Sequence, residues 1–347
     1  MAIDLKKLKP TTVSRDLRGK FVFLYGPPKI GKTTLAVQFP RNLLLAVEHG
    51  FNAIDSIYAV DVPTWGEFKN YVKQLKDPEL KQQFDTVTID TIGLLYDRCE
   101  AYICDREGVD KIGDVPYGAG FKMVDKEFEE NVRKIIQILD DDGKPSYGLC
   151  LIGHDKVRVE TDGQISITHI TPDVTDRCAK IINRMVDLTA YIGLEDNVRY
   201  IYPRQVVLEN AKNKQITEIY AGSHFASLND KIELGYDNLV NAIADAMEYN
   251  NSGKKIKLSD APVSTGAVNE IDFKKVKSAI GKIARTLNKL DEENEESHYM
   301  EDYKAIVDKY LGKNKLVKDS TEAQAEHLQG ILDELQDYLK TKEIVAQ

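Results

Sequence analysis

The sequence predicts an α/β fold with a mainly parallel sheet and β-hairpins, followed by a small all-α module. Three observations lead to this prediction. From about residue 20 to residue 193, short apolar runs alternate with amphipathic stretches, which is the pattern of βα units. A glycine-rich segment follows the first apolar run and precedes a helical stretch. Beyond a polar segment at 249–267, the apolar residues recur only at helical spacing.

The strands predicted for the parallel sheet are short apolar runs flanked by turn or charged residues, as is typical of buried strands. They are residues 21–25, 43–47, 86–89, 149–152 and 188–192. The helices predicted between them are residues 66–75, 92–106 and 121–139. In the last helix the apolar residues follow steps of three and four, so we expect one of its faces to pack on the sheet.

Turn residues and composition mark the later segments. Residues 156–170 and 199–220 are β-rich and contain polar turns, so we expect hairpins that extend the sheet or project from it. Residues 272–290, 299–311 and 321–341 are predicted to form three helices. The predicted domains are an N-terminal arm at 1–18, a core at 19–248, a linker at 249–268 and a helical partner-binding module at 269–347.

Composition limits the possible classes of protein. The chain has 347 residues, 42% of them hydrophobic, which excludes a disordered, collagen-like or disulfide-scaffold protein. The net charge of -9 argues against a protein that coats a polyanion, although clustered cations can still form a local basic groove. The four cysteines lack CxxC pairing, so we expect reduced core residues and a cytoplasmic location. The sequence has no export signal and no apolar run long enough to cross a membrane, so we expect no membrane association.

The strongest motif is GPPKIGKTT at residues 26–34, which fits the phosphate-loop (P-loop) pattern GxxxxGK[ST] and lies between a strand and a helix. Its glycines let backbone N–H groups turn toward phosphates, and the start of the helix adds a positive end. Lys32 is expected to reach the β- and γ-phosphates, and Thr33 to bind Mg²⁺. The alternative interpretation of residues 26–34 is a structural glycine turn before a helix that binds no phosphate. The motif predicts ATP and Mg²⁺ as cofactors and a nucleotide site made of Gly26, Pro27, Pro28, Lys29, Ile30, Gly31, Lys32, Thr33 and Thr34.

Three polar residues end other predicted strands. Asp90 is expected to hold the metal together with Thr33, or alternatively to cap the next helix. Glu48 lies where ligands bind in open α/β folds, and can orient or deprotonate the attacking water. His154 can sense the γ-phosphate, or simply be a hydrogen-bonded histidine at a strand end. The predicted catalytic residues are therefore Glu48, Lys32 and His154.

The order of these features resembles the RecA-like ATPase core: a P-loop strand, a strand ending in Glu-His, the Asp90 strand, and a polar-ended strand followed by a hairpin. Within that class, Val-Glu-His-Gly at 47–50 and Pro-Tyr-Gly-Ala-Gly-Phe at 116–121 resemble the phage ATP-binding proteins of the Sak-type single-strand annealing recombinases. The resemblance covers residues 18–225. His154 departs from it, because RecA has a glutamine there. The resemblance implies ATP-dependent binding of single-stranded DNA by a filament or ring, with strand annealing or exchange as the outcome in phage-type recombination.

The resemblance also implies partner-binding residues. It puts DNA loops at about 105–120 and 155–180, where phosphates would meet Lys156, Arg158, Arg177 and Lys180. The alternative is that these four basic residues are solvated loop side chains that bind no DNA. Lys212 and Lys214 are where the resemblance puts a cation that reaches a neighbouring subunit's γ-phosphate. The helical module resembles C-terminal domains of phage annealing proteins, which implies docking of a partner such as single-strand DNA-binding protein.

Two other functions remain open. A P-loop ATPase that loads or remodels a replication protein, such as a helicase loader, would use the helical module as its grip, but the core lacks an arginine-bearing lid domain. A phosphotransfer enzyme such as a nucleotide kinase needs an arginine-rich lid, and residues 155–180 contain only Arg158 and Arg177. Stimulation of ATP hydrolysis by single-stranded DNA distinguishes the recombinase from both alternatives.

Overall fold

The fold is taken from a computed structural model that describes residues 14–162, 165–210, 215–225, 227–250, 258, 272–294, 297–342 and 344. The chain divides into two compact units, Met1–Ala267 and Val268–Gln347. Most of the predicted arm at 1–18 and of the predicted linker at 249–268 lies outside the described residues. Within those two segments, Leu17 and Leu258 are buried among the core residues of the first unit.

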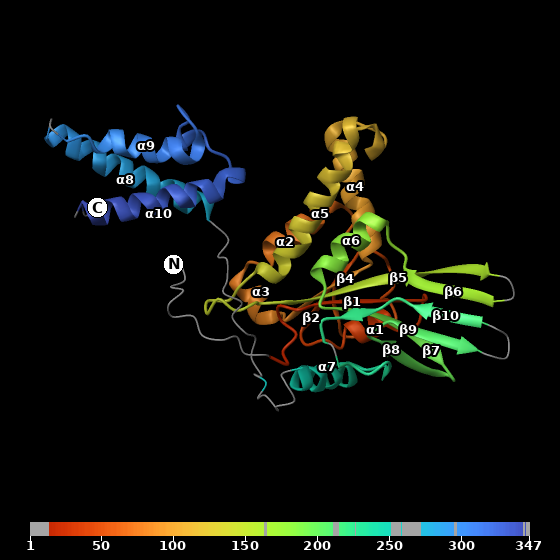
Figure 1. Ribbon diagram of the computed structural model, residues 1–347. Coiled ribbons are helices and arrows are strands. Elements are labelled where there is room, and N and C mark those ends of the chain that lie inside the picture. Colours follow the sequence, from red (N-terminus) through yellow and green to blue (C-terminus); the bar gives the residue numbers. More distant parts are fainter. Residues whose placement is uncertain are drawn as a thin grey trace. The chain divides into compact units, whose positions relative to one another are not determined.

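The first unit is built on a mostly parallel sheet with the strand order β12-β8-β7-β1-β5-β4-β2-β3 (Figure 1). The predicted α/β class with a mainly parallel sheet is therefore confirmed. The sequence analysis missed the edge strand β3, whose four residues are exposed or only partly buried. The strands are β1 (Phe21–Gly26), β2 (Asn42–Ala46), β3 (Tyr58–Asp61), β4 (Thr86–Asp90), β5 (Gly148–Asp162), β6 (Ile165–Pro172), β7 (Leu188–Glu195), β8 (Val198–Tyr202), β9 (Val206–Asn210), β10 (Gln215–Ile219), β11 (Gly222–Ser223) and β12 (Ile232–Glu233).

Helices cover both faces of this sheet. Along β1, Phe21, Phe23 and Tyr25 point into one core, which α2, α4, α5 and α6 complete, whereas Val22 and Leu24 point into the other, which α1 and α7 complete (Figure 1). Both faces are therefore buried, as the apolar strands predict. The helices are α1 (Lys32–Ala36), α2 (Trp65–Gln74), α3 (Pro78–Gln83), α4 (Ile92–Glu107), α5 (Ala119–Gln137), α6 (Asp176–Met185), α7 (Tyr236–Asn250), α8 (Phe273–Glu293), α9 (Tyr299–Leu311) and α10 (Ala325–Thr341).

A smaller layer of strands projects from the sheet (Figure 1). β5 is 15 residues long, much longer than predicted, and its second half pairs with β6 as the predicted hairpin. β10 joins β6 in parallel and pairs with β9 as a second hairpin. The prediction of one hairpin over 199–220 was wrong in extent, because residues 198–202 form β8 and pair with β7 instead.

The second unit is a three-helix bundle of α8, α9 and α10 with its own apolar core, which includes Ile280, Leu287, Leu328 and Leu335. The predicted C-terminal helices are therefore confirmed. The last helix is preceded by a capping box in which Thr321 and Gln324 bond each other's backbone N–H groups. Within the described parts of both units, no helix is long and apolar enough to cross a bilayer.

Candidate functional site

The loop between β1 and α1 has a backbone that only particular residues accept. Gly26 and Gly31 have φ values of 155° and 108°, and Lys29 between them also has a positive φ, 65°. A Cβ atom on Gly26 would lie 2.4 Å from the carbonyl oxygen of Ile192 on the neighbouring strand β7. Glycine is therefore required at residue 26 both for its conformation and for the close approach of two strands.

The Lys32 side chain lies inside this loop. Its ammonium group donates hydrogen bonds to the carbonyl oxygens of Gly26 (2.7 Å) and Pro27 (2.8 Å), and the residue is only 6% exposed. Burial lowers the pKa of Lys32, whereas the nearby carboxylates, Asp90 first, act to raise it. Because α1 has only five residues, we expect the helix end to add less to phosphate binding than Lys32 and the loop N–H groups do.

Thr33 and Asp90 meet across the sheet edge. The hydroxyl of Thr33 donates a 2.6 Å hydrogen bond to the carboxylate of Asp90, which is buried at the end of β4. Burial raises the pKa of Asp90, and the hydrogen bond from Thr33 opposes that shift. The N-cap position of α4 is Thr91, so Asp90 does not cap that helix. The peptide bond between Asp90 and Thr91 is cis.

Glu48 and His154 form a direct pair. Nε2 of His154 lies 3.0 Å from a carboxylate oxygen of Glu48, and both side chains are partly exposed. Nδ1 of the same ring is buried and has no hydrogen-bond partner among the described residues. A proton on Nε2 fits these surroundings, because that nitrogen faces a carboxylate acceptor. His49 lies apart from the pair, with its ring 3.3 Å from Asp61.

Sheet order brings these groups together. β1, β5, β4 and β2 are successive neighbours. Gly26, Asp90 and Ala46 end β1, β4 and β2 at the same edge, and His154 lies opposite Gly26 at that edge, within the longer strand β5. The structure therefore gathers Lys32, Thr33, Asp90, Glu48 and His154 at the carboxyl edge, where ligands bind in open α/β sheets. The sequence analysis missed one further carboxylate there, Asp155, which acts to raise the pKa of Lys32.

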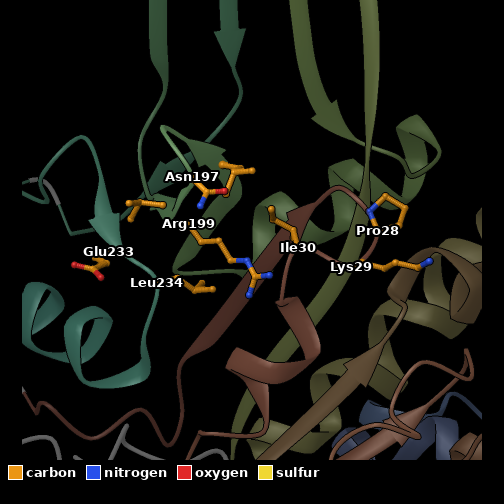
Figure 2. Close-up of a pocket in the computed structure, with 9 residues that line it drawn as sticks. Pro28, Lys29, Ile30, Asn197, Arg199, Glu233 and Leu234 are labelled. Atoms are coloured by element: carbon orange, nitrogen blue, oxygen red, sulfur yellow. The ribbon is translucent and has the colours of Figure 1, made fainter.

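A cavity of about 720 Å³ adjoins the outer side of the P-loop (Figure 2). Arg199 enters it from β8, and its Nη1 lies 3.6 Å from where a Cβ on Gly31 would stand. The two-residue turn Asp196–Asn197, with both φ values positive, aligns β7 and β8 and so positions Arg199. The Glu-Asp-Asn-Val sequence between two strands is the signal that could have revealed this turn. The cavity is lined by Pro28, Lys29, Ile30, Leu194, Asn197, Val198, Arg199, Glu233 and Leu234.

The predicted DNA-binding cations do not form one group. Lys156 and Arg158 line a separate cavity of about 580 Å³ between the projecting strands and α6, where Arg158 pairs with Glu160 at 2.8 Å. Arg177 on α6 is paired instead with Asp125 on α5, at 2.8 Å. Lys180 is exposed on α6 and does not line that cavity.

The remaining predicted cations, Lys212 and Lys214, lie outside the described residues.

The donor set of Thr33 and Asp90 fits Mg²⁺, because a hydroxyl and a carboxylate are the oxygen ligands that this ion prefers. Over the described residues, no group of three or more His, Cys, Asp or Glu side chains could hold a metal ion. A magnesium ion at this edge would therefore take most of its ligands from water and from the phosphates of a nucleotide.

The fold and this site define a P-loop NTPase. Residues 18–219, more than half of the chain, match the AAA_24 family model, described as an AAA domain, and the chain belongs to that family. An AAA domain implies nucleotide binding with a divalent metal and ATPase chemistry. The chain is also 26% identical over 349 residues to the SPbeta prophage-derived uncharacterized protein YorG of Bacillus subtilis (strain 168), covering 98% of this chain and 99% of that protein. The resemblance to Sak-type recombinases stays a prediction.

Proposed function

We propose that this protein is an ATP-dependent recombinase that binds single-stranded DNA and promotes strand annealing or exchange in phage-type recombination. Its membership of the AAA domain family supports the ATPase part. The name of its relative YorG, an SPbeta prophage-derived protein, supports a phage setting for this chain as well. In this proposal the protein acts in the cytoplasm of a bacterial host, as a homo-oligomeric filament or ring.

The proposal depends most on one observation, which is the course of β5. This strand begins in the centre of the sheet and passes the candidate site at His154, beside Glu48. It then continues without a break into the projecting hairpin, where Lys156 and Arg158 follow. Four residues of extended strand span about 13 Å, so His154 and Arg158 lie within one rigid segment. The nucleotide site and the hairpin that carries Lys156 and Arg158, together with the carboxylates of Asp155, Glu160 and Asp162, are thus joined within a single strand.

Each residue at the sheet edge has a role in this proposal. Lys32 binds the β- and γ-phosphates, and Thr33 and Asp90 would hold a magnesium ion, whose chemistry would be to neutralise phosphate charge. Glu48 orients the attacking water and accepts its proton. His154 holds the Glu48 carboxylate in position, so it is a positioning residue in the absence of the γ-phosphate.

The cavity beside the P-loop is suited to the nucleoside part of ATP. Its apolar side chains, such as Ile30 and Leu234, provide a surface for a base, and Arg199 supplies a cation next to the loop. We therefore assign Arg199 to the binding of the nucleotide rather than to the bond-breaking step.

Tyr117 is the second candidate contact for DNA. Its side chain is fully exposed, and its φ of 59° belongs to a conformation that non-glycine residues rarely adopt. It lies in the predicted DNA loop at 105–120. An exposed aromatic ring provides a stacking surface for an unpaired base, which is how many proteins bind single strands without sequence preference.

The experiment that tests the proposal is ATP hydrolysis with and without an oligonucleotide, at low and moderate salt. Lys32→Ala is the blank, since it removes the phosphate-binding ammonium. The proposal expects strong stimulation by single-stranded DNA that fades as salt rises. Hydrolysis without stimulation and without DNA retention would instead favour the loader or remodeller, whose grip would be the helical unit.

The same proposal expects the helical unit to dock a protein partner such as single-strand DNA-binding protein.

A further inference from the structure

The outward face of α8 in the second unit is strongly basic. Between residues 273 and 290 this helix contains six lysine and arginine residues and no acidic residue, in a chain whose net charge is -9. We define the basic face of α8 by five exposed side chains, which are Lys274, Lys275, Lys282, Arg285 and Lys289.

These five cations form one band along the helix. At about 100° per residue they fall within an arc of roughly 100°, opposite the buried positions Val276, Ile280, Ile283 and Leu287. From residue 274 to residue 289 the band is about 22 Å long, at 1.5 Å rise per residue. The apolar side of α8 is used by its own core, so only the basic face is available to a partner.

The cations on this face are largely without acidic partners. Lys289 pairs with Glu293 at 3.6 Å, both side chains being mostly exposed, and Arg285 donates to the carbonyl oxygen of Gly281. No ion pair is found for Lys275 or Lys282 within the described part of the chain. Like charges three or four residues apart destabilise a helix, so this arrangement is unfavourable unless anions from outside compensate it.

Gly281 adds an independent observation. It lies in the middle of α8, beside the basic face, and a Cβ atom there would meet nothing within 4 Å. Packing therefore does not require glycine, although glycine in a helix interior is less stable than alanine. Its lack of a side chain leaves a low point next to Arg285, where a linear ligand can approach the helix closely.

We propose that the basic face of α8 binds the phosphate backbone of single-stranded DNA, giving the protein a DNA contact separate from its ATPase unit. A band of cations along one side of a helix matches a linear polyanion with regularly spaced charges. A bilayer surface is not matched, because the apolar side of α8 is already buried and cannot insert. The choice of single-stranded DNA rests on the proposed function, whereas the polyanion chemistry rests on α8 alone.

The test is binding of the full-length protein to a fluorescently labelled oligothymidine, followed by anisotropy across a salt series. The triple variant Lys275→Gln, Lys282→Gln and Lys289→Gln removes three charges and keeps good helix-forming residues. It should bind about tenfold or more weakly at 50 mM salt, and its slope of log affinity against log salt should be smaller by about 2, at 0.7 per phosphate contact.

A matched control removes three exposed charges from the other helices of the same unit. It is Lys304→Gln, Lys340→Gln and Lys342→Gln, and it should keep the wild-type affinity and slope. ATP hydrolysis without DNA should be unchanged in both variants, and far-UV circular dichroism and thermal unfolding like those of the wild type verify that the helical unit is folded. Equal binding and slope for the two triple variants would overturn this proposal while leaving the proposed function intact. A wild-type protein that binds no oligothymidine at any salt would overturn both.

Discussion

Replacing Gly26 by alanine tests the account of the P-loop most directly, because the structure defines what the added methyl group meets. The new Cβ atom would stand 2.4 Å from the carbonyl oxygen of Ile192 and 3.3 Å from its carbonyl carbon. Both atoms belong to the backbone of β7, which pairs with β1 and β8 and cannot move aside. The strain must therefore be relieved by displacing the loop itself.

The magnitude follows from two costs. Overpacking against a rigid neighbour costs about 1–3 kcal/mol. Holding a non-glycine residue at a φ of 155° adds about 1–2 kcal/mol. The sum is roughly 2–5 kcal/mol, and at about 2–4 °C per kcal/mol for a unit of this size the melting temperature should fall by roughly 4–20 °C.

Thermal unfolding and equilibrium ATP binding measure the two possible outcomes of that strain. Gly113→Ala is the control, because a Cβ there meets nothing within 4 Å and its φ is not positive. We expect Gly26→Ala to lose stability, ATP affinity or both, and Gly113→Ala to lose neither. If Gly26→Ala melted and bound ATP like the wild type, the close approach of the loop to β7 would not exist in solution.

Three further predictions concern single side chains. Glu48→Gln should slow ATP hydrolysis by about 100-fold or more while sparing ATP binding, and turnover at the wild-type rate would show that another group activates the water. Arg199→Ala should raise the KM for ATP by about tenfold with little change in kcat, whereas an unchanged KM would remove Arg199 from the nucleotide site. Burial acts to raise the pKa of Glu127, but hydrogen bonds from Trp65 and Lys69 outweigh it and hold that pKa below its usual value. The contribution of Glu127 to stability is therefore fully present above its pKa in the unfolded chain, and it is lost as pH falls through its pKa in the folded protein. Fluorescence of Trp65, the single tryptophan, should report this loss. Glu127→Gln should abolish that acid-dependent change in fluorescence.

The sequence predicted those site residues that end buried strands. Lys32 and Thr33 follow β1 in a recognisable motif, and Asp90 ends an apolar run, so the parallel-sheet rule alone brings them to one edge. The same rule put Glu48 and His154 at that edge, but it did not predict their direct contact. That contact depends on side-chain rotamers and on which strands are neighbours, and periodicity determines neither.

Other features were beyond the sequence pattern. Arg199 lies 168 residues after Gly31 in the chain and meets it only because β7 is the neighbour of β1. The length of β5 was underestimated, because beyond His154 the strand leaves the buried sheet and polar residues alternate with valines. Such an alternation predicts a strand that is exposed on one side. It does not predict that this strand is a direct continuation of the strand in the centre of the sheet.

The pair of Glu48 and His154 suggests how ATP and the projecting hairpin influence each other. A ligand shifts a conformation only through a difference in its contacts with the two states. When Glu48 turns to orient water, Nε2 of His154 loses its partner, and Nδ1 has none among the described residues. Because the ring is partly exposed, water can then bond Nε2, and in the proposed function the γ-phosphate is the partner whose presence depends on the state of the nucleotide. Because Arg158 lies on the same strand, the proposed function expects a contact between His154 and the γ-phosphate to be the route by which the state of the nucleotide reaches the hairpin.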